Sequence, residues 1–159
     1  MRIVSQNAVA SMAKIIVLDT GPAGKIAHPH VDPYVKQWLA EHIAAGDRIA
    51  LPEIVDYELR RNFLLEVRRG RSTFTRSLQR LDELRNTLVF LPLSSDVMLK
   101  AAELWAEIRT RGKPTADDKA LDGDVILAAQ AMLIDGTIVT ENPGHLALFV
   151  KVERWHRSS

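Results

Sequence analysis

Four polar residues that lie far apart in the sequence have the types and settings to do chemistry: Asp19, Glu58, Asp124 and Asn142. Each ends, opens or adjoins an apolar stretch of the kind that forms the edge of an α/β core. Sites in parallel α/β sheets form at the carboxyl ends of the strands. Because Mg²⁺ prefers carboxylate oxygen, acids that meet at such an edge favour a divalent cation and phosphate chemistry.

The local setting of each residue also allows a simpler interpretation. Asp19 precedes Thr20-Gly21-Pro22 and has the sequence context of a turn former. Glu58 falls within an expected helix, where a solvated side chain is the alternative to a site. Asn142 precedes Pro-Gly and could form an Asx turn. The functional interpretation therefore requires that the fold bring these residues together.

Asp122 competes with Asp124 for the third acidic position. A helix expected at 122–135 would use Asp122 as its N-cap and Asp124 as a first-turn acid. The two positions are about 200° apart around a regular helix, so both rarely face one site. We favour Asp124 as the ligand and Asp122 as the cap. Glu53 and Glu141 remain substitutes for a missing acid.

Short apolar runs alternate with helical patterns along most of the chain. The expected strands are 14–18, 48–51, 88–91, 137–140 and 149–153, and the expected helices are 33–45, 52–69, 72–86, 94–110 and 122–135. This alternation predicts an α/β fold with a parallel twisted sheet of about five strands flanked by helices. The helical pair at 60–85 interrupts the alternation, so we expect it to protrude.

Positive charge is concentrated in one segment. Residues 60–80 contain seven arginines and one acid, Glu66, so the segment carries +6 while the rest of the chain carries −5. A polyanion partner is the functional interpretation, and a solvated helix face is the alternative. The candidate residues for binding such a partner are Arg60, Arg61, Arg68, Arg69 and Arg71.

Size and composition narrow the class of protein. The chain has 159 residues and no cysteine, which favours one domain and excludes disulfides and thiolate metal sites. The absence of cysteine is compatible with a cytoplasmic location. The longest mostly apolar stretch, 125–134, is too short to span a bilayer. We expect residues 1–13 to be a disordered extension, with Met12 as an alternative start, and 14–159 to be the domain.

Four segments in order carry a family resemblance. They are 16–22 (IVLDTGP), 51–61 (LPEIVDYELRR), 124–131 (DVILAAQA) and 139–146 (VTENPGHL). Together they resemble the PIN domain, in particular the VapC-like toxins of bacterial toxin–antitoxin pairs, and the resemblance runs over about 14–155, nearly the whole chain. Each segment is weak by itself, but four in the same order and spacing are specific.

The resemblance implies a Mg²⁺- or Mn²⁺-dependent endoribonuclease, a hydrolase that cleaves RNA phosphodiester bonds. It places Asp19, Glu58 and Asp124 at the metal, with Asn142 as a further catalytic position where some members have an acid. Thr20 and Thr140, with Asp122, would orient ligands or contact substrate.

The resemblance also implies an antitoxin protein and a homodimer. The alternative function is a non-catalytic PIN-like module that binds RNA or protein and keeps the acids for structure. A phosphoacceptor domain is disfavoured, because no lysine follows the strand at 137–140.

Overall fold

The computed structural model describes residues 13–111 and 118–155. Of the expected N-terminal extension at 1–13, all but Ala13 lies outside the described residues. The strands are β1 (Ile15–Leu18), β2 (Arg48–Pro52), β3 (Val89–Leu91), β4 (Thr137–Thr140) and β5 (Val152–Arg154). The helices are α1 (Thr20–Ala27), α2 (Pro33–Ala44), α3 (Glu53–Arg68), α4 (Phe74–Thr87), α5 (Ser95–Arg111) and α6 (Asp118–Met132), with a short 3₁₀ helix at Gly144–Leu148.

The five strands form one parallel sheet in the order β3-β2-β1-β4-β5. β1 lies at the centre, pairing Val17 with Ala50 of β2 on one side and with Ile138 of β4 on the other. The chain therefore leaves β1 toward one edge and returns on the other side through β4. The carboxyl ends of β1 and β4 mark the switch in strand order where open α/β sheets form their sites. The predicted α/β fold with a five-stranded parallel sheet is confirmed.

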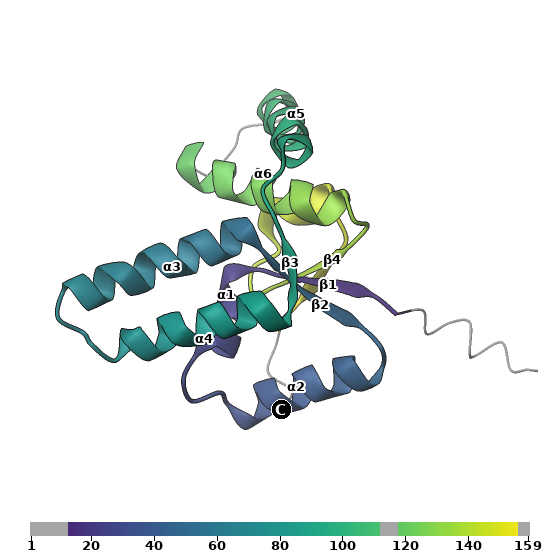
Figure 1. Cartoon of the computed structure of the whole chain (residues 1–159). Helices are drawn as coiled ribbons and strands as arrows, with labels where there is room; N and C mark the ends of the chain where they lie inside the picture. The colour runs from purple at the N-terminus through teal and green to yellow at the C-terminus, as the bar shows by residue number, and fades with distance from the viewer. Residues whose placement is uncertain (1–12, 112–117, 156–159) are drawn as a thin grey trace, which may run out of the picture.

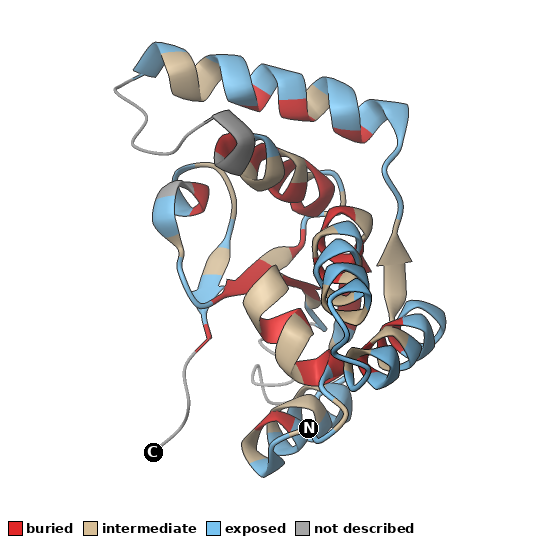
Figure 2. Ribbon diagram, turned by 90° about the vertical axis from the view of Figure 1, so that its left-hand side faces the viewer, coloured by how far each residue is buried: buried red, intermediate tan, exposed pale blue. Residues whose placement is uncertain are grey.

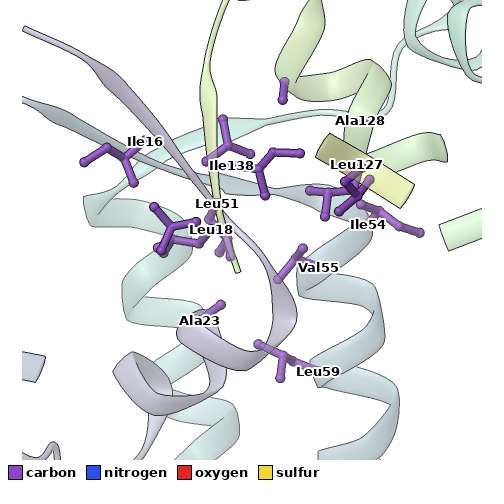
Figure 3. Packing of buried hydrophobic residues seen from close by; sticks show 14 of the residues in the cluster. Ile16, Leu18, Ala23, Leu51, Ile54, Val55, Leu59, Leu127, Ala128 and Ile138 are labelled. Atoms are coloured by element: carbon purple, nitrogen blue, oxygen red, sulfur yellow. The ribbon is translucent and has the colours of Figure 1, made fainter. Parts of the chain in front are cut away.

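Helices cover both sides of the sheet, which explains why the central strands are nearly continuous apolar runs. α6 lies on one side with α5 outside it, and α2 lies on the opposite side (Figure 1). Buried residues line α6 and the inner side of α5, whose outer surface is exposed (Figure 2). Figure 3 shows the centre of the core, where Leu18 and Leu51 of the sheet lie near Ala23 of α1 and Val55 of α3. This packing fixes the ends of β1, α1 and α3 relative to one another.

The expected protruding helical pair is present as the α3–α4 hairpin, whose turn lies far from the sheet (Figure 1). A buried acid joins its two helices. The Asp56 carboxylate accepts from Arg60 Nε at 3.0 Å and Nη2 at 3.1 Å, and Arg60 Nη1 also pairs with Asp82 of α4 at 2.8 Å. Arg85 lies 3.6 Å from Asp56 and packs over the ring of Phe90 in β3. Ion pairs thus join the two helices of the hairpin, and Arg85 links α4 to the sheet through Phe90.

Two elements differ from the sequence prediction. α1 was not expected, because Gly21, Pro22 and Gly24 interrupt the helical pattern. Pro22 lies in the first turn, where its missing N–H removes no intrahelical hydrogen bond. α6 begins at Asp118 rather than at 122. Within the described residues, no helix combines the length and apolar character needed to cross a membrane.

Candidate active site

Asp19 lies where the two central strands end side by side. Its backbone N donates to Val139 O at 3.0 Å, continuing the pairing of β1 with β4. Its carboxylate then caps α1, with Oδ1 accepting from Thr20 N at 2.7 Å. Oδ2 accepts from the hydroxyl of Thr140 at 2.6 Å. Asp19 is therefore held by the start of α1 and by the end of β4, and the role of Thr140 in a site stays a prediction.

Glu58 reaches the same place from α3. Its Oε2 accepts from the Thr20 hydroxyl at 2.7 Å, although the two residues are 38 positions apart. The buried neighbours Val55 and Leu59 pack α3 into the core and leave Glu58 only partly covered. Thr20 thus contacts both acids, through its backbone N to Asp19 and its hydroxyl to Glu58. The structure brings Asp19, Thr20, Glu58 and Thr140 together, as their assignment to one site required.

The third acidic segment approaches Glu58 through a glycine. A β-carbon on Gly123 of α6 would lie 2.7 Å from Glu58 Oε1, closer than real β-carbons come to such atoms. A larger residue at 123 would therefore displace Glu58. The sequence offered no signal for this role, because Gly123 in isolation resembles a helix-weakening residue.

The predicted N-cap role of Asp122 is wrong. α6 begins four residues earlier, at Asp118, so Asp122 lies within the helix. Its exposed side chain borders an apolar groove with Met98 and Trp105 of α5. Asp124 is partly buried and borders a small cavity with Leu146. The two acids therefore line different surfaces of α6, as the angle between their positions indicated.

Asn142 lies just beyond β4, and its backbone is tied to the site. Its N–H donates to the Thr140 hydroxyl at 3.1 Å. Its side-chain oxygen lies 3.9 Å from the position of a β-carbon on Gly144. The backbone of Asn142 therefore supports Thr140, and a catalytic role for its side chain stays a prediction.

An ion pair that the sequence analysis did not identify adjoins the site. Lys25 of α1 donates to Glu141, the residue after β4. The hydrogen bond that Lys25 donates to Glu141 is the main cause that raises the pKa of Lys25, so the lysine is a cation at neutral pH. Without α1 in the predicted fold, nothing placed Lys25 one helical turn beyond Gly21, where the Glu141 side chain lies. Glu141, expected only as a substitute acid, is thus present at the site.

The donor chemistry fits a hard divalent cation. Asp19 and Glu58 supply two carboxylates linked through Thr20. Mg²⁺ is commonly held by one or two carboxylates while keeping several waters, and Mn²⁺ accepts the same oxygen ligands. No three acidic or histidine side chains of the described part of the chain form a ready-made metal cluster. Asp124 as a third ligand therefore stays a prediction.

The candidate RNA-binding arginines differ in whether their guanidinium groups already have partners within the protein. Arg60 is engaged by Asp56 and Asp82, and Arg61 lies 5.2 Å from the centre of the Tyr57 ring.

At the tip of the hairpin, Arg69 and Arg71 both pair with Glu66, while Arg68 is exposed. The tip therefore carries three arginines against one acid and keeps a net positive charge, and RNA binding by these residues stays a prediction.

The fold is shared with solved structures of toxin–antitoxin complexes. No protein-family model and no curated protein matches the chain. VapBC2 from Rickettsia felis, bound to a DNA fragment from its promoter, matches with a TM-score of 0.68 and 22% identity over 89% of this chain and 99% of that chain. DNA-bound VapBC from Salmonella typhimurium matches with a TM-score of 0.70 and 17% identity over 91% and 100%.

VapBC-5 from Mycobacterium tuberculosis, a member of the VapBC family of toxin–antitoxin systems, matches with a TM-score of 0.57 and 20% identity over 88% and 96%. At these identities the likeness concerns the fold, and it covers nearly the whole length of the matched chains. The chain therefore has the fold of the VapC-like PIN domains that its sequence resembles.

Proposed function

We propose that this chain is a metal-dependent endoribonuclease and acts in the cytoplasm as the toxin of a type II toxin–antitoxin pair. The observation that carries the proposal is the meeting of Asp19 and Glu58 through Thr20 at the switch point of the sheet. Structural roles alone do not call for two acids on one threonine at the position where α/β folds bind ligands. The shared fold with VapBC structures supports the same assignment.

Asp19, Glu58 and Asp124 are the residues that would hold Mg²⁺ or Mn²⁺. When bound, the ion would activate a water and offset the negative charge that develops on the phosphate. The two threonines orient the acids, because Thr140 donates to Asp19 and Thr20 donates to Glu58. Each carboxylate thus presents a fixed direction for its remaining lone pairs, and each is a proton acceptor for an attacking water.

The same proposal assigns partners to the hairpin. The tip arginines would hold the RNA backbone, whose phosphates bind cations with salt-sensitive affinity. A hollow of about 330 Å³ lies between α1, α3 and α4, with the rings of Phe63 and Phe74 5.9 Å apart at its wall. We assign the hollow to the apolar side chains of an amphipathic antitoxin helix, since such helices insert apolar side chains into grooves. A homodimer completes the proposed assembly.

A cleavage assay with matched variants tests the activity. The parent should cut single-stranded RNA with Mg²⁺ or Mn²⁺ and stop when the ion is chelated. Asp19→Asn should lose at least about 100-fold in rate while keeping its fold, since one ligand carboxylate is lost.

Asp135→Asn is the control, because Asp135 is 87% exposed and has φ 51°, which asparagine tolerates. Equal cleavage by the parent and Asp19→Asn would exclude the mechanism. A parent that binds RNA but is inert with either ion would favour the non-catalytic module.

A further inference from the structure

The ion pair of Lys25 and Glu141 bridges the same two segments that hold Asp19. Lys25 lies on α1, which Asp19 caps, and Glu141 directly follows Thr140, which donates to Asp19. A β-carbon on Gly21 would lie 3.0 Å from both Cδ and Oε2 of Glu141. The Glu141 side chain therefore runs along the first turns of α1, from Gly21 to Lys25, beside the candidate catalytic acids.

The charge around this pair is unfavourable for a polyanion. Asp19, Glu58 and Glu141 place three carboxylates near the end of β4, and a phosphodiester that enters would be repelled by each. Lys25 is a cation whose contacts, within the described residues, place it at this edge. The arginines of the hairpin tip lie at the end far from the sheet (Figure 1). They can hold distant phosphates but not the one next to the reacting bond.

The pair is also easy to open. The side chains of Lys25 and Glu141 are 41% and 46% exposed, so both are accessible to solvent. Exposed ion pairs contribute little to stability, because water solvates the separated charges well. Exchange of one anionic partner of Lys25 for another therefore costs little.

We propose that Lys25 binds a phosphate of the RNA strand next to the scissile bond, and that Glu141 holds Lys25 in the free protein and competes with that phosphate. The inference rests on the proposed function and adds to it a substrate-binding residue and an internal competitor. Glu141 sets the affinity for RNA, because the phosphate must displace it from Lys25. Removing the competitor strengthens binding, and removing the lysine weakens it.

Binding of a fluorescent single-stranded RNA in the presence of EDTA isolates affinity from cleavage. Lys25→Met should weaken binding about 3- to 10-fold and reduce the slope of log K against log salt by about 0.7, the loss of one phosphate contact. Glu141→Gln should tighten binding about 3-fold. Lys25→Arg keeps the charge and should restore parental affinity. In cleavage assays, Lys25→Met should raise KM more than it lowers kcat.

The pair of Lys14 and Glu153 provides the matched control. Lys14 Nζ and Glu153 Oε1 are 3.0 Å apart, and the two side chains are 55% and 46% exposed. Lys14 precedes β1, however, so it lies at the amino ends of the strands, opposite the end that carries the candidate site. Lys14→Met and Glu153→Gln should leave affinity and salt slope unchanged.

If Lys25→Met and Lys14→Met weaken RNA binding equally, the effect comes from the net charge of the protein, and the proposal is overturned. If Lys25→Met keeps the parental Kd and salt slope while the parent cleaves RNA, the role of Lys25 is refuted and the proposed function stands. A parent that neither binds nor cuts RNA would refute the proposed function and this inference with it.

Discussion

Glu58 Oε1 lies so close to Gly123 that a β-carbon on the glycine would stand 2.7 Å from it. The contact joins α3 to α6 and leaves no room for any other residue at 123 without moving Glu58. The atom that must move is the end of the flexible Glu58 side chain, so the fold can tolerate a larger residue at 123. The candidate site cannot, because the Glu58 carboxylate is displaced. This difference separates effects on activity from effects on stability.

Gly123→Ala should therefore lower the proposed nuclease activity without unfolding the protein. The methyl group pushes Glu58 away from Thr20, and we expect at least a roughly 10-fold fall in kcat. Alanine in a helix is favoured over glycine by about 0.5 to 1 kcal/mol, so the free energy of unfolding should hold or rise. Gly24→Ala is the control, since its β-carbon would make an ordinary 3.4 Å contact with Leu59. Full activity in Gly123→Ala would mean that the position of Glu58 does not matter.

Thr20→Val should remove the hydroxyl that orients Glu58 while keeping the side-chain shape. Because the 2.7 Å hydrogen bond holds the acid rather than the substrate, kcat should fall about 10-fold with little change in KM. Thr20→Ser keeps the donor and should keep most of the activity. If valine and serine behave alike, the hydroxyl has no part in the reaction.

Asp56→Asn should destabilise the α3–α4 hairpin. The Asp56 side chain is 4% exposed and is paired with Arg60 and Arg85, which are 29% and 44% exposed. Removing a partner from a buried pair costs about 3 to 5 kcal/mol, and the exposure of the arginines lowers our expectation to about 2 kcal/mol. Urea denaturation measures this loss. Asp82→Asn removes the 61% exposed partner of Arg60 and should cost less than about 1 kcal/mol.

Asp47 should make the protein sensitive to acid. The backbone N–H of Lys14, and next the His42 ring, lower the pKa of Asp47 below its usual 3.8. A lowered pKa in the folded state means that the carboxylate stabilises the fold above about pH 3.8 and that this contribution is lost as pH falls through the folded value.

The comparison variant for this effect is Asp47→Asn. It should be less stable than the parent at neutral pH, and the difference should shrink in the acidic window below about pH 4. Chemical denaturation at a series of pH values measures both curves. A constant difference across that window would exclude titration of Asp47 as the cause.

Expression of the chain alone should slow the growth of a bacterial host if it is a toxin. Asp19→Asn should abolish the effect. Co-expression of an antitoxin encoded by a neighbouring small reading frame should restore the growth of cells that express the parent protein. A harmless protein that still cuts RNA when purified would be a nuclease of another role. Growth inhibition by Asp19→Asn equal to the parent would disconnect toxicity from the proposed site.

The sequence alone was sufficient to predict the parallel sheet and to identify the candidate acids. Ile15–Leu18 and Thr137–Thr140 are short apolar strands bounded by polar residues, and local pattern suffices to identify such runs. Asp19 could be assigned to the site because residues that follow a central parallel strand lie at its carboxyl edge. The charge of the hairpin was equally visible, since it depends only on composition.

Helix boundaries exceeded what local pattern could decide. α1 was hidden by Pro22 and its flanking glycines, which are permitted because the first turn lacks intrahelical N–H partners. α6 starts at Asp118, so the N-cap chemistry of Asp122 was a misleading signal. In both cases tertiary packing outweighs local propensity, which differs between residues by less than 1 kcal/mol in most cases.

Only the tertiary structure decided how the site is assembled. Thr20 contacts Glu58 across 38 positions and Glu141 contacts Lys25 across 116, and no periodicity encodes either contact. The close approach of Gly123 to Glu58 likewise requires α3 and α6 to pack at one particular distance. Side-chain contacts between distant segments depend on the packing of the whole core. Residue types could therefore identify the candidate acids, but not the residues that contact and position them.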